Sequence, residues 1–155
     1  MTSKAAYALV TIVLLSCNAS TKKAVSTSSE LPLVGTWQLL QATLIEKGDT
    51  TITNYSSNIS FINVINETHF AFLQHDLKKG KDSAALFVAG GGRYTLKDSL
   101  YTEQLEYCSA REWEGHDFPF TLTLNADTLT QFGREVVAAA GVDRINIERY
   151  VRVKQ

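Results

Sequence analysis

The feature that most constrains the fold of this chain is a series of short segments in which apolar and polar residues alternate. In residues 118–124 every second residue is Phe or Leu, and Thr lies between the later ones. A period of two is typical of a β-strand that buries one face. Eight further segments have strand-like sequences, so that eight or nine strands are predicted in all: 35–46, 60–65, 68–75, 84–89, 92–96, 100–107, 128–132 and 145–153.

Short polar breaks at residues 66–67, 97–99 and 125–127 separate several of these segments. Such connections suit tight hairpins, so neighbouring strands are expected to pair antiparallel. A long run of hairpins must close or leave exposed edges, and closure at about eight strands also leaves room for one small ligand. We therefore predict an all-β, antiparallel up-and-down barrel of about eight strands in residues 31–155, with a two-sheet sandwich as the alternative. Residues 134–141 are predicted to form a short helix or a wide loop.

The first sixteen residues have the pattern of a cleavable export signal. Lys4 is their only charged residue, and an apolar run of eleven residues, 5–15, follows it. This run matches the ~7–15 residues of a signal-peptide core and is shorter than the ~18 that span a bilayer. Residues 1–16 are therefore predicted to be removed.

Residues 14–17, with the sequence Leu-Leu-Ser-Cys, resemble the lipobox of bacterial lipoproteins. The resemblance implies that Cys17 carries a diacylglycerol and becomes the first residue of the mature protein, anchored to a membrane. Residues 17–30 are rich in Ser and Thr, which is typical of a flexible tether. Because Asn18 rather than Asp follows the cysteine, the resemblance implies the outer membrane, and the lack of an acidic run in the tether favours its periplasmic face over the cell surface.

The remaining composition excludes several kinds of chemistry. Only Cys17 and Cys108 are cysteines, so lipidation of the first leaves no pair for a disulfide, and Cys108 is expected to pack as a small apolar residue. The slight acidic excess lacks the basic surface that nucleic acid requires. His69, His75 and His116 have no compact ligand spacing, so no metal or cofactor is expected. The sequence contains no hydrolase elbow, phosphate-binding loop or zinc-protease helix, and we expect no enzymatic activity.

Two motifs resemble those of a known protein family. Gly35-Thr36-Trp37 resembles the Gly-X-Trp signature of lipocalin-like (calycin-like) barrels, which implies that Trp37 closes the barrel floor and that an Arg near the last strand covers its ring. The expected arginine is Arg152, with Arg149 as the second choice; a guanidinium over indole contributes about 0.5–2 kcal/mol. Residues 90–107 resemble the Gly-rich hairpin of uncharacterised bacterial lipocalin-like lipoprotein domains.

The segment 100–107 supplies the main candidates for a ligand site. Tyr101, Glu103, Leu105 and Tyr107 share one face of this predicted strand, which we expect to be the interior. A carboxylate buried there must be hydrogen-bonded, paired or protonated, so Glu103 is the best candidate for a polar anchor. The complete candidate set for ligand binding is Phe72, Phe87, Tyr94, Tyr101, Glu103, Leu105 and Tyr107.

These observations favour a lipid-anchored envelope protein that binds a small, partly apolar ligand in its barrel. This hypothesis predicts a cavity of roughly 300 Å3 or more. The alternative is a non-catalytic structural module, or one that contacts protein or glycan, with a filled core. An interior filled by aromatic side chains would favour this alternative; those expected there are Trp37, Phe70, Phe72, Phe87 and Tyr101.

Overall fold

The computed structural model describes residues 31–81 and 83–154. The predicted signal peptide (1–16), the predicted lipidation site Cys17 and the predicted tether up to residue 30 lie outside the described residues. The strands are β1 (Gly35–Glu46), β2 (Asp49–Asn54), β3 (Ile59–Ile65), β4 (His69–Asp76), β5 (Phe87–Lys97), β6 (Leu100–Cys108), β7 (His116–Asn125), β8 (Thr128–Val137) and β9 (Val142–Arg152). Two 3-10 turns, η1 (Arg111–Trp113) and η2 (Ala138–Ala140), follow β6 and β8. No helix in this part of the chain is long and apolar enough to cross a membrane.

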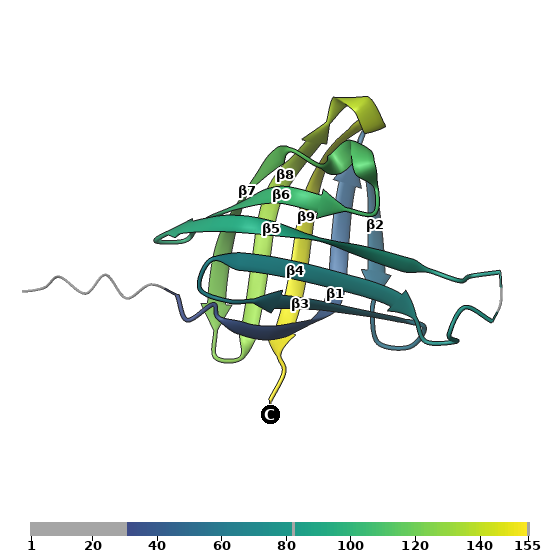
Figure 1. Cartoon of the computed structure of the whole chain (residues 1–155), viewed down its shortest axis with the longest axis horizontal. Coiled ribbons are helices and arrows are strands. Elements are labelled where there is room, and N and C mark those ends of the chain that lie inside the picture. The colour runs from purple at the N-terminus through teal and green to yellow at the C-terminus, as the bar shows by residue number, and fades with distance from the viewer. Residues whose placement is uncertain (1–30, 82, 155) are drawn as a thin grey trace, which may run out of the picture.

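The strands form a closed antiparallel barrel (Figure 1). From β3 to β9 each strand pairs with the next, and β9 then pairs with β1 along most of its length. The first part of β1 pairs with β3, which completes a ring of eight strands, whereas β2 pairs only with the second part of β1. The predicted up-and-down barrel is therefore confirmed, and the pairing of first and last strands excludes the sandwich.

The strand β2 was not predicted. Its sequence, Asp-Thr-Thr-Ile-Thr-Asn, contains one aliphatic residue, and nearly all of it is exposed to solvent. It lies beside the ring and buries no face, so it carries no alternation of apolar and polar residues. The hairpin turn at Lys47 and Gly48, both with positive φ, fixes its pairing with β1.

The prediction of two strands at residues 84–89 and 92–96 is wrong, because a single strand, β5, runs through the three glycines between them. A side chain on Gly91 would place its Cβ 2.6 Å from the carbonyl oxygen of Phe70, and one on Gly90 would overlap the Phe72 ring. The glycines therefore allow close packing of neighbouring strands and do not form a turn.

Half of the segment 134–141 is strand. Residues 134–137 extend β8, with Glu135 and Val137 buried, and only η2 has the compact form that a short helix or loop would take. Gly141 ends η2 in the left-handed region, with φ of 67°.

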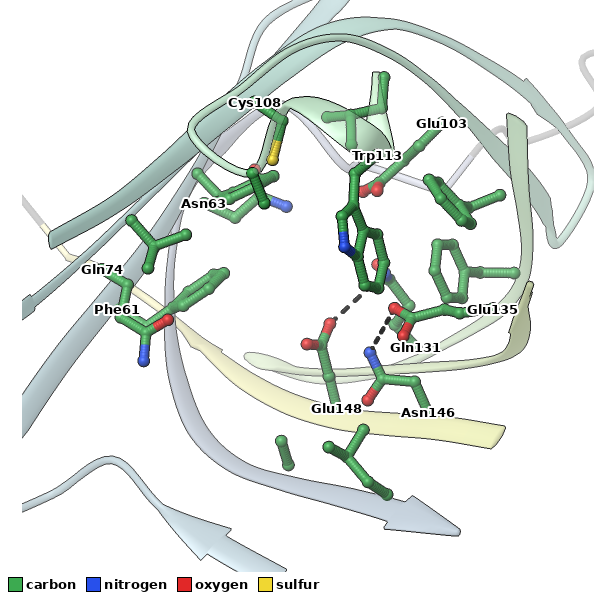
Figure 2. A pocket seen from close by; sticks show the side chains of 18 of the residues that line it. Phe61, Asn63, Gln74, Glu103, Cys108, Trp113, Gln131, Glu135, Asn146 and Glu148 are labelled. Carbon is green, nitrogen blue, oxygen red and sulfur yellow. Dashed lines mark hydrogen bonds between the residues drawn. The ribbon is translucent and has the colours of Figure 1, made fainter. Parts of the chain in front are cut away.

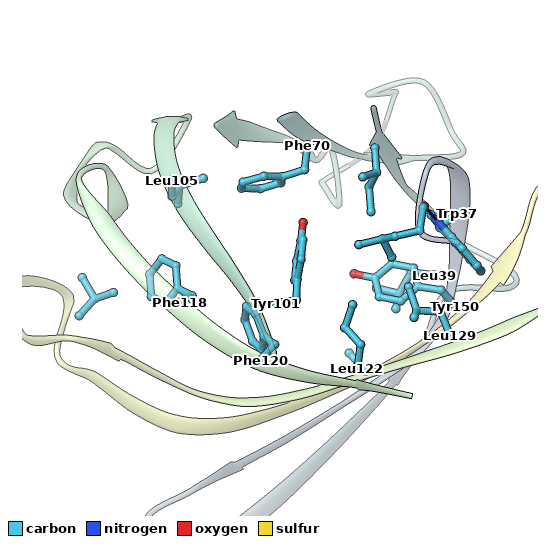
Figure 3. Close-up of a cluster of buried hydrophobic side chains, with 14 residues drawn as sticks. Trp37, Leu39, Phe70, Tyr101, Leu105, Phe118, Phe120, Leu122, Leu129 and Tyr150 are labelled. Atoms are coloured by element: carbon cyan, nitrogen blue, oxygen red, sulfur yellow. Dashed lines mark hydrogen bonds between the residues drawn. The ribbon is translucent and has the colours of Figure 1, made fainter. Parts of the chain in front are cut away.

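One end of the barrel is packed solid. Figure 3 shows Tyr101 near the centre of the buried cluster, with Trp37 and Tyr150 toward one side and Leu105 and Phe118 toward the other. Trp37 is fully buried and donates its indole N–H to the carbonyl of Leu33 at 2.8 Å. The segment that precedes β1 thus closes this end, while η1 and η2 lie at the opposite end (Figure 1).

Candidate ligand-binding site

A cavity of about 330 Å3 occupies the half of the barrel that the aromatic cluster leaves open (Figure 2). Along β1, Trp37 and Leu39 pack in the closed half, whereas Ala42 and Leu44, further along the strand, line the cavity. The cavity wall has an apolar part and a polar part.

Aromatic rings form much of the apolar part. Phe61 and Phe72 stack with ring centroids 5.7 Å apart, and Tyr55 contacts the Phe61 ring edge-on at 5.9 Å. Phe118, on β7, packs against Trp113 of η1 at 5.6 Å. These five rings present flat, partly exposed apolar surface to the cavity, which suits a hydrocarbon or aromatic ligand group.

Carboxyl and amide groups form the polar part, and β8 and β9 supply most of them. Asn146 donates to Glu135 at 2.9 Å, and Arg144 pairs with the other oxygen of the same carboxylate at 2.6 Å. The Tyr150 hydroxyl donates to Glu148 at 2.7 Å. Glu135 therefore has a cationic partner, whereas the contacts of Glu148 come from uncharged groups.

Two of the cavity carboxyls are shifted toward their neutral form. Burial raises the pKa of Glu103 to about 8, with the negative charge of Glu148 as the next cause, while the nearby Tyr101 hydroxyl opposes the shift. Burial likewise raises the pKa of Glu148 to about 7, opposed by the hydrogen bond from Tyr150. Both groups therefore change protonation near neutral pH.

The polar wall also contains unused hydrogen-bond acceptors. The side-chain oxygens of Asn63 and Asn146 are buried and accept no hydrogen bond from the described residues. The orientation of Asn146 is fixed because its nitrogen donates to Glu135. A ligand that brings N–H or O–H groups would satisfy these oxygens.

The turn η1 holds an aromatic side chain at the cavity. The indole of Trp113 projects into it in Figure 2, and the Arg144 guanidinium lies 5.2 Å from the centre of this indole. Glu114 fixes the segment, because it accepts from the backbone N–H of Cys108 at 2.9 Å and from Arg111 at 3.0 Å. The Cys108 N–H is the main reason why the pKa of Glu114 is lowered.

The sequence-predicted candidates are divided between the cavity and its surroundings. Phe72, Glu103 and Leu105 line the cavity. Tyr94 and Tyr101 lie beneath it in the packed half, with ring centroids 5.1 Å apart. The structure thus brings three of the seven candidates to the cavity and places two more beneath it.

The expected interior positions of Tyr107 and Phe87 are wrong, since these residues are 69% and 68% exposed. In the pairing of β5 with β6, Gly91 lies opposite Tyr107 and Gly92 opposite Leu105, so Glu106 is an extra residue. This bulge reverses the alternation, turns Tyr107 outward and brings Cys108 to the cavity. Phe87 begins β5 on the outer face, and its neighbour Val88 faces the cavity.

Trp37 and Arg152, which the family resemblance predicts to close the end of the barrel, are in contact. The Arg152 guanidinium carbon is 4.1 Å from the centre of the Trp37 ring, whereas Arg149 points outward and is exposed. Gly35 leaves the space that Arg152 occupies, because a Cβ there would be 2.6 Å from one of its terminal nitrogens.

Sequence reasoning missed most of the polar wall. Gln131 and Glu135 alternate with outward residues on β8, and Arg144, Asn146 and Glu148 do so on β9. The available signal was this period of two, but the residues between them on β9, Ile145 and Ile147 among others, are the apolar ones and would ordinarily be assigned to the interior.

Within the described part of the chain, no three His, Cys, Asp or Glu side chains are grouped so as to hold a metal ion. The chain matches no protein-family model and no curated protein at a significant level. The closed eight-stranded antiparallel barrel is itself consistent with a calycin-like fold.

Proposed function

We propose that this protein is a lipid-anchored binding protein of the bacterial envelope, and that its barrel holds one small, partly apolar ligand without catalysing a reaction. The cavity of about 330 Å3, lined on one side by aromatic rings and on the other by polar groups, carries the proposal. Protein interiors are normally packed to the density of organic crystals, and ligand sites of about 300–1,000 Å3 are the usual exception.

The division of the barrel into two halves supports binding over a purely structural role. Trp37, Phe70 and Tyr101 fill the closed half, as a scaffold requires. In the open half, however, the buried oxygens of Asn63 and Asn146 have no hydrogen-bond partner among the described residues, which costs stability in an unliganded scaffold. A ligand would recover part of that cost.

The lipid anchor belongs to the same proposal. Leu33 and Val34 enter the barrel at its closed end, where their carbonyls accept hydrogen bonds from Trp37 and Arg152. A chain anchored through Cys17, with residues 18–30 as tether, would therefore be attached at the end opposite the cavity. We propose the periplasmic face of the outer membrane as its place and no interaction with nucleic acid.

One observation favours the second candidate function, a module that contacts a protein or glycan. Leu73, Phe87 and Tyr107 are exposed large side chains on the neighbouring strands β4, β5 and β6. Aromatic side chains on an exposed sheet face are typical of contact surfaces. This function would not need the cavity.

Fluorescence titration with N-phenyl-1-naphthylamine, a neutral apolar probe, tests the proposal. The protein used is the mature chain from residue 17 with Cys17→Ser, which removes the lipid but keeps every described residue. Leu105→Trp places a larger side chain in the cavity, whereas Leu73→Trp makes the same change on the outer face. We expect the parent and Leu73→Trp to bind the probe and a folded Leu105→Trp not to bind it.

Near-ultraviolet circular dichroism and urea unfolding establish that the variants are folded, since overpacking costs about 1–3 kcal/mol. If the folded parent does not bind the probe, or if Leu105→Trp binds it equally well, the proposed function is wrong.

A further inference from the structure

The charges that line the cavity do not balance. Three carboxyl groups, those of Glu103, Glu135 and Glu148, line it together with one basic side chain, Arg144. Arg144 pairs with Glu135 at 2.6 Å and lies over Trp113, and its charge lowers the pKa of Glu148 only as the smallest of several causes. Glu103 and Glu148 therefore share the cavity without a cationic side chain of their own.

The hydrogen bonds offered to these two carboxyls are few and uncharged. Glu148 accepts from the Tyr150 hydroxyl at 2.7 Å and, at a long 3.5 Å, from Gln131. Glu103 is 9% exposed and lies near Gln131 and the Tyr101 hydroxyl, which partly oppose its shift toward the neutral form. A buried carboxyl so placed favours its neutral form, and a cation bound beside it would stabilise the charged form.

Acceptors exceed donors in the rest of the polar wall as well. The oxygen of Asn146 cannot exchange places with its nitrogen, because that nitrogen donates to Glu135. This oxygen accepts no hydrogen bond from any residue that the structure describes. The buried oxygen of Asn63, on the other side of the cavity, likewise accepts no hydrogen bond from the described residues. An ammonium group has three donors and no acceptor, so it complements this wall. A carboxylate ligand would add another negative charge and more acceptors.

The apolar wall begins close to the acid groups. The Phe61 ring lies 6.3 Å from the ring of Tyr150, whose hydroxyl is bonded to Glu148, and Phe72 stacks on the other side of Phe61. A molecule with a cationic head and an adjoining aromatic or aliphatic body would thus meet complementary surface at both ends.

We propose that the cavity selects a hydrophobic amine, with the ammonium group bound between Glu103 and Glu148 and the hydrocarbon part against Phe61 and Phe72. The inference rests on the proposed function and names its ligand class. Binding converts both carboxyls to their charged form, so protons are released as the amine enters.

Other ionisable groups act on the same site. From β9, Arg144 and Tyr150 contact the polar wall; from β8, Glu135; from β6, Tyr101 and Cys108. Tyr55 lies across the cavity, with its pKa raised by burial and then by Glu148. None of these tyrosines has a lowered pKa, so the change near neutral pH comes from the two glutamates.

Calorimetric titration with three matched indoles tests the inference: tryptamine (ammonium), tryptophol (neutral) and indole-3-acetate (carboxylate). They share one ring and a similar side chain, so differences in affinity report the head group. We expect tryptamine to bind the Cys17→Ser mature chain about tenfold or more tightly than tryptophol at about pH 8, and indole-3-acetate to bind most weakly. The affinity for tryptamine should fall as the pH is lowered to about 6, because Glu103 and Glu148 become protonated.

Glu103→Gln and Glu148→Gln should each bring tryptamine close to the affinity of tryptophol while N-phenyl-1-naphthylamine still binds. Glu106→Gln, on the outer side of β6, is the matched control and should change neither. If the neutral probe binds but the three indoles bind alike, or if the tryptamine preference survives both substitutions, the inference is wrong and the proposed function stands. If the neutral probe also fails to bind, the proposed function is wrong as well. Should either variant be unfolded, the pH dependence of tryptamine binding in the parent chain decides the inference.

Discussion

Arg152 fastens the last strand of the barrel to the segment that precedes the first, with Trp37 between them. Its guanidinium carbon lies 4.1 Å from the centre of the Trp37 ring, and its two terminal nitrogens donate to the carbonyls of Val34 and Pro32. One planar side chain thus contacts the indole with its face and two backbone carbonyls with its edge. A lysine cannot reproduce this arrangement.

We therefore expect Arg152→Lys to lower the free energy of unfolding by about 1–3 kcal/mol, because the cation–π contact and at least one hydrogen bond are lost. Urea unfolding followed by circular dichroism measures the change. Arg149→Lys, a matched change of an exposed side chain three residues earlier, should stay within about 0.5 kcal/mol of the parent. Equal losses for the two variants would contradict this role of Arg152.

The stability of the protein should fall as the pH rises from about 5 to about 8. Between the ordinary pKa of a glutamate, 4.5, and the raised pKa of Glu103, about 8, the folded state holds a proton that the unfolded state releases. The free energy of unfolding therefore falls by up to about 1.4 kcal/mol for each pH unit and for each carboxyl group whose pKa is raised.

Glu103→Gln, which resembles the protonated acid, should flatten this decline, whereas Glu106→Gln should keep it. Urea unfolding at a series of pH values gives the slope. A parent whose stability rises over this range would show that Glu103 is ionised in the folded protein.

Gly92→Ala should be strongly destabilising, by about 3 kcal/mol or more, because its Cβ would overlap the carbonyl oxygen of Gln104 at the bulge in β6. Gly141→Ala is the comparison: its Cβ would meet nothing, and only the positive φ of 67° opposes it, at about 1 kcal/mol. Thermal unfolding should rank the parent first, Gly141→Ala second and Gly92→Ala last. The reverse order for the two variants would mean that the bulge can shift.

The two tryptophans should respond differently to a bound ligand. Trp37 is fully buried at the closed end, whereas Trp113 lines the cavity. In Trp37→Phe, where Trp113 alone remains, N-phenyl-1-naphthylamine should quench most of the tryptophan emission. In Trp113→Phe the quenching should be clearly weaker. If the probe quenched Trp113→Phe, in which Trp37 alone remains, more strongly than Trp37→Phe, it would be bound outside the cavity.

Lipidation can be tested separately from binding. In a bacterial host that processes lipoproteins, the wild-type chain should enter the detergent phase on Triton X-114 partitioning, and its mass should correspond to a chain that begins at Cys17 and carries acyl groups. Cys17→Ser should remain in the aqueous phase. A wild-type protein found only in the aqueous phase would contradict the lipobox interpretation.

The sequence predicted those parts of the barrel in which one face is apolar and buried. Phe118, Phe120 and Leu122 alternate in β7 because that strand packs its inner face against the closed-end cluster. Where a strand buries no face, as in β2, or where glycines replace side chains, as in Gly90–Gly92, the period of two is lost although the pairing continues.

The candidate site was only partly predictable, for two physical reasons. A bulge is defined by how two strands pair: the extra residue Glu106 lies in β6, but only the register with Gly91 and Gly92 of β5 makes it extra, so the outward turn of Tyr107 does not follow from the sequence of β6 alone. The cavity wall formed by β9 is polar, which inverts the usual rule for this strand: Asn146 and Glu148 face inward while Ile145 and Ile147 lie on the outer side. Glu103 was found because its neighbours Tyr101 and Leu105 follow the ordinary rule.

The entry of the chain at the closed end has a mechanical consequence. Any pull from the N-terminal side reaches the barrel first at residues 32–34, whose carbonyls accept hydrogen bonds from Arg152 and Trp37. The load is therefore passed into the buried cluster at the closed end and across to β9, at the end of the barrel opposite η1 and Trp113. The end of the barrel that contains the cavity can therefore keep its shape while force acts on the N-terminal side of the domain.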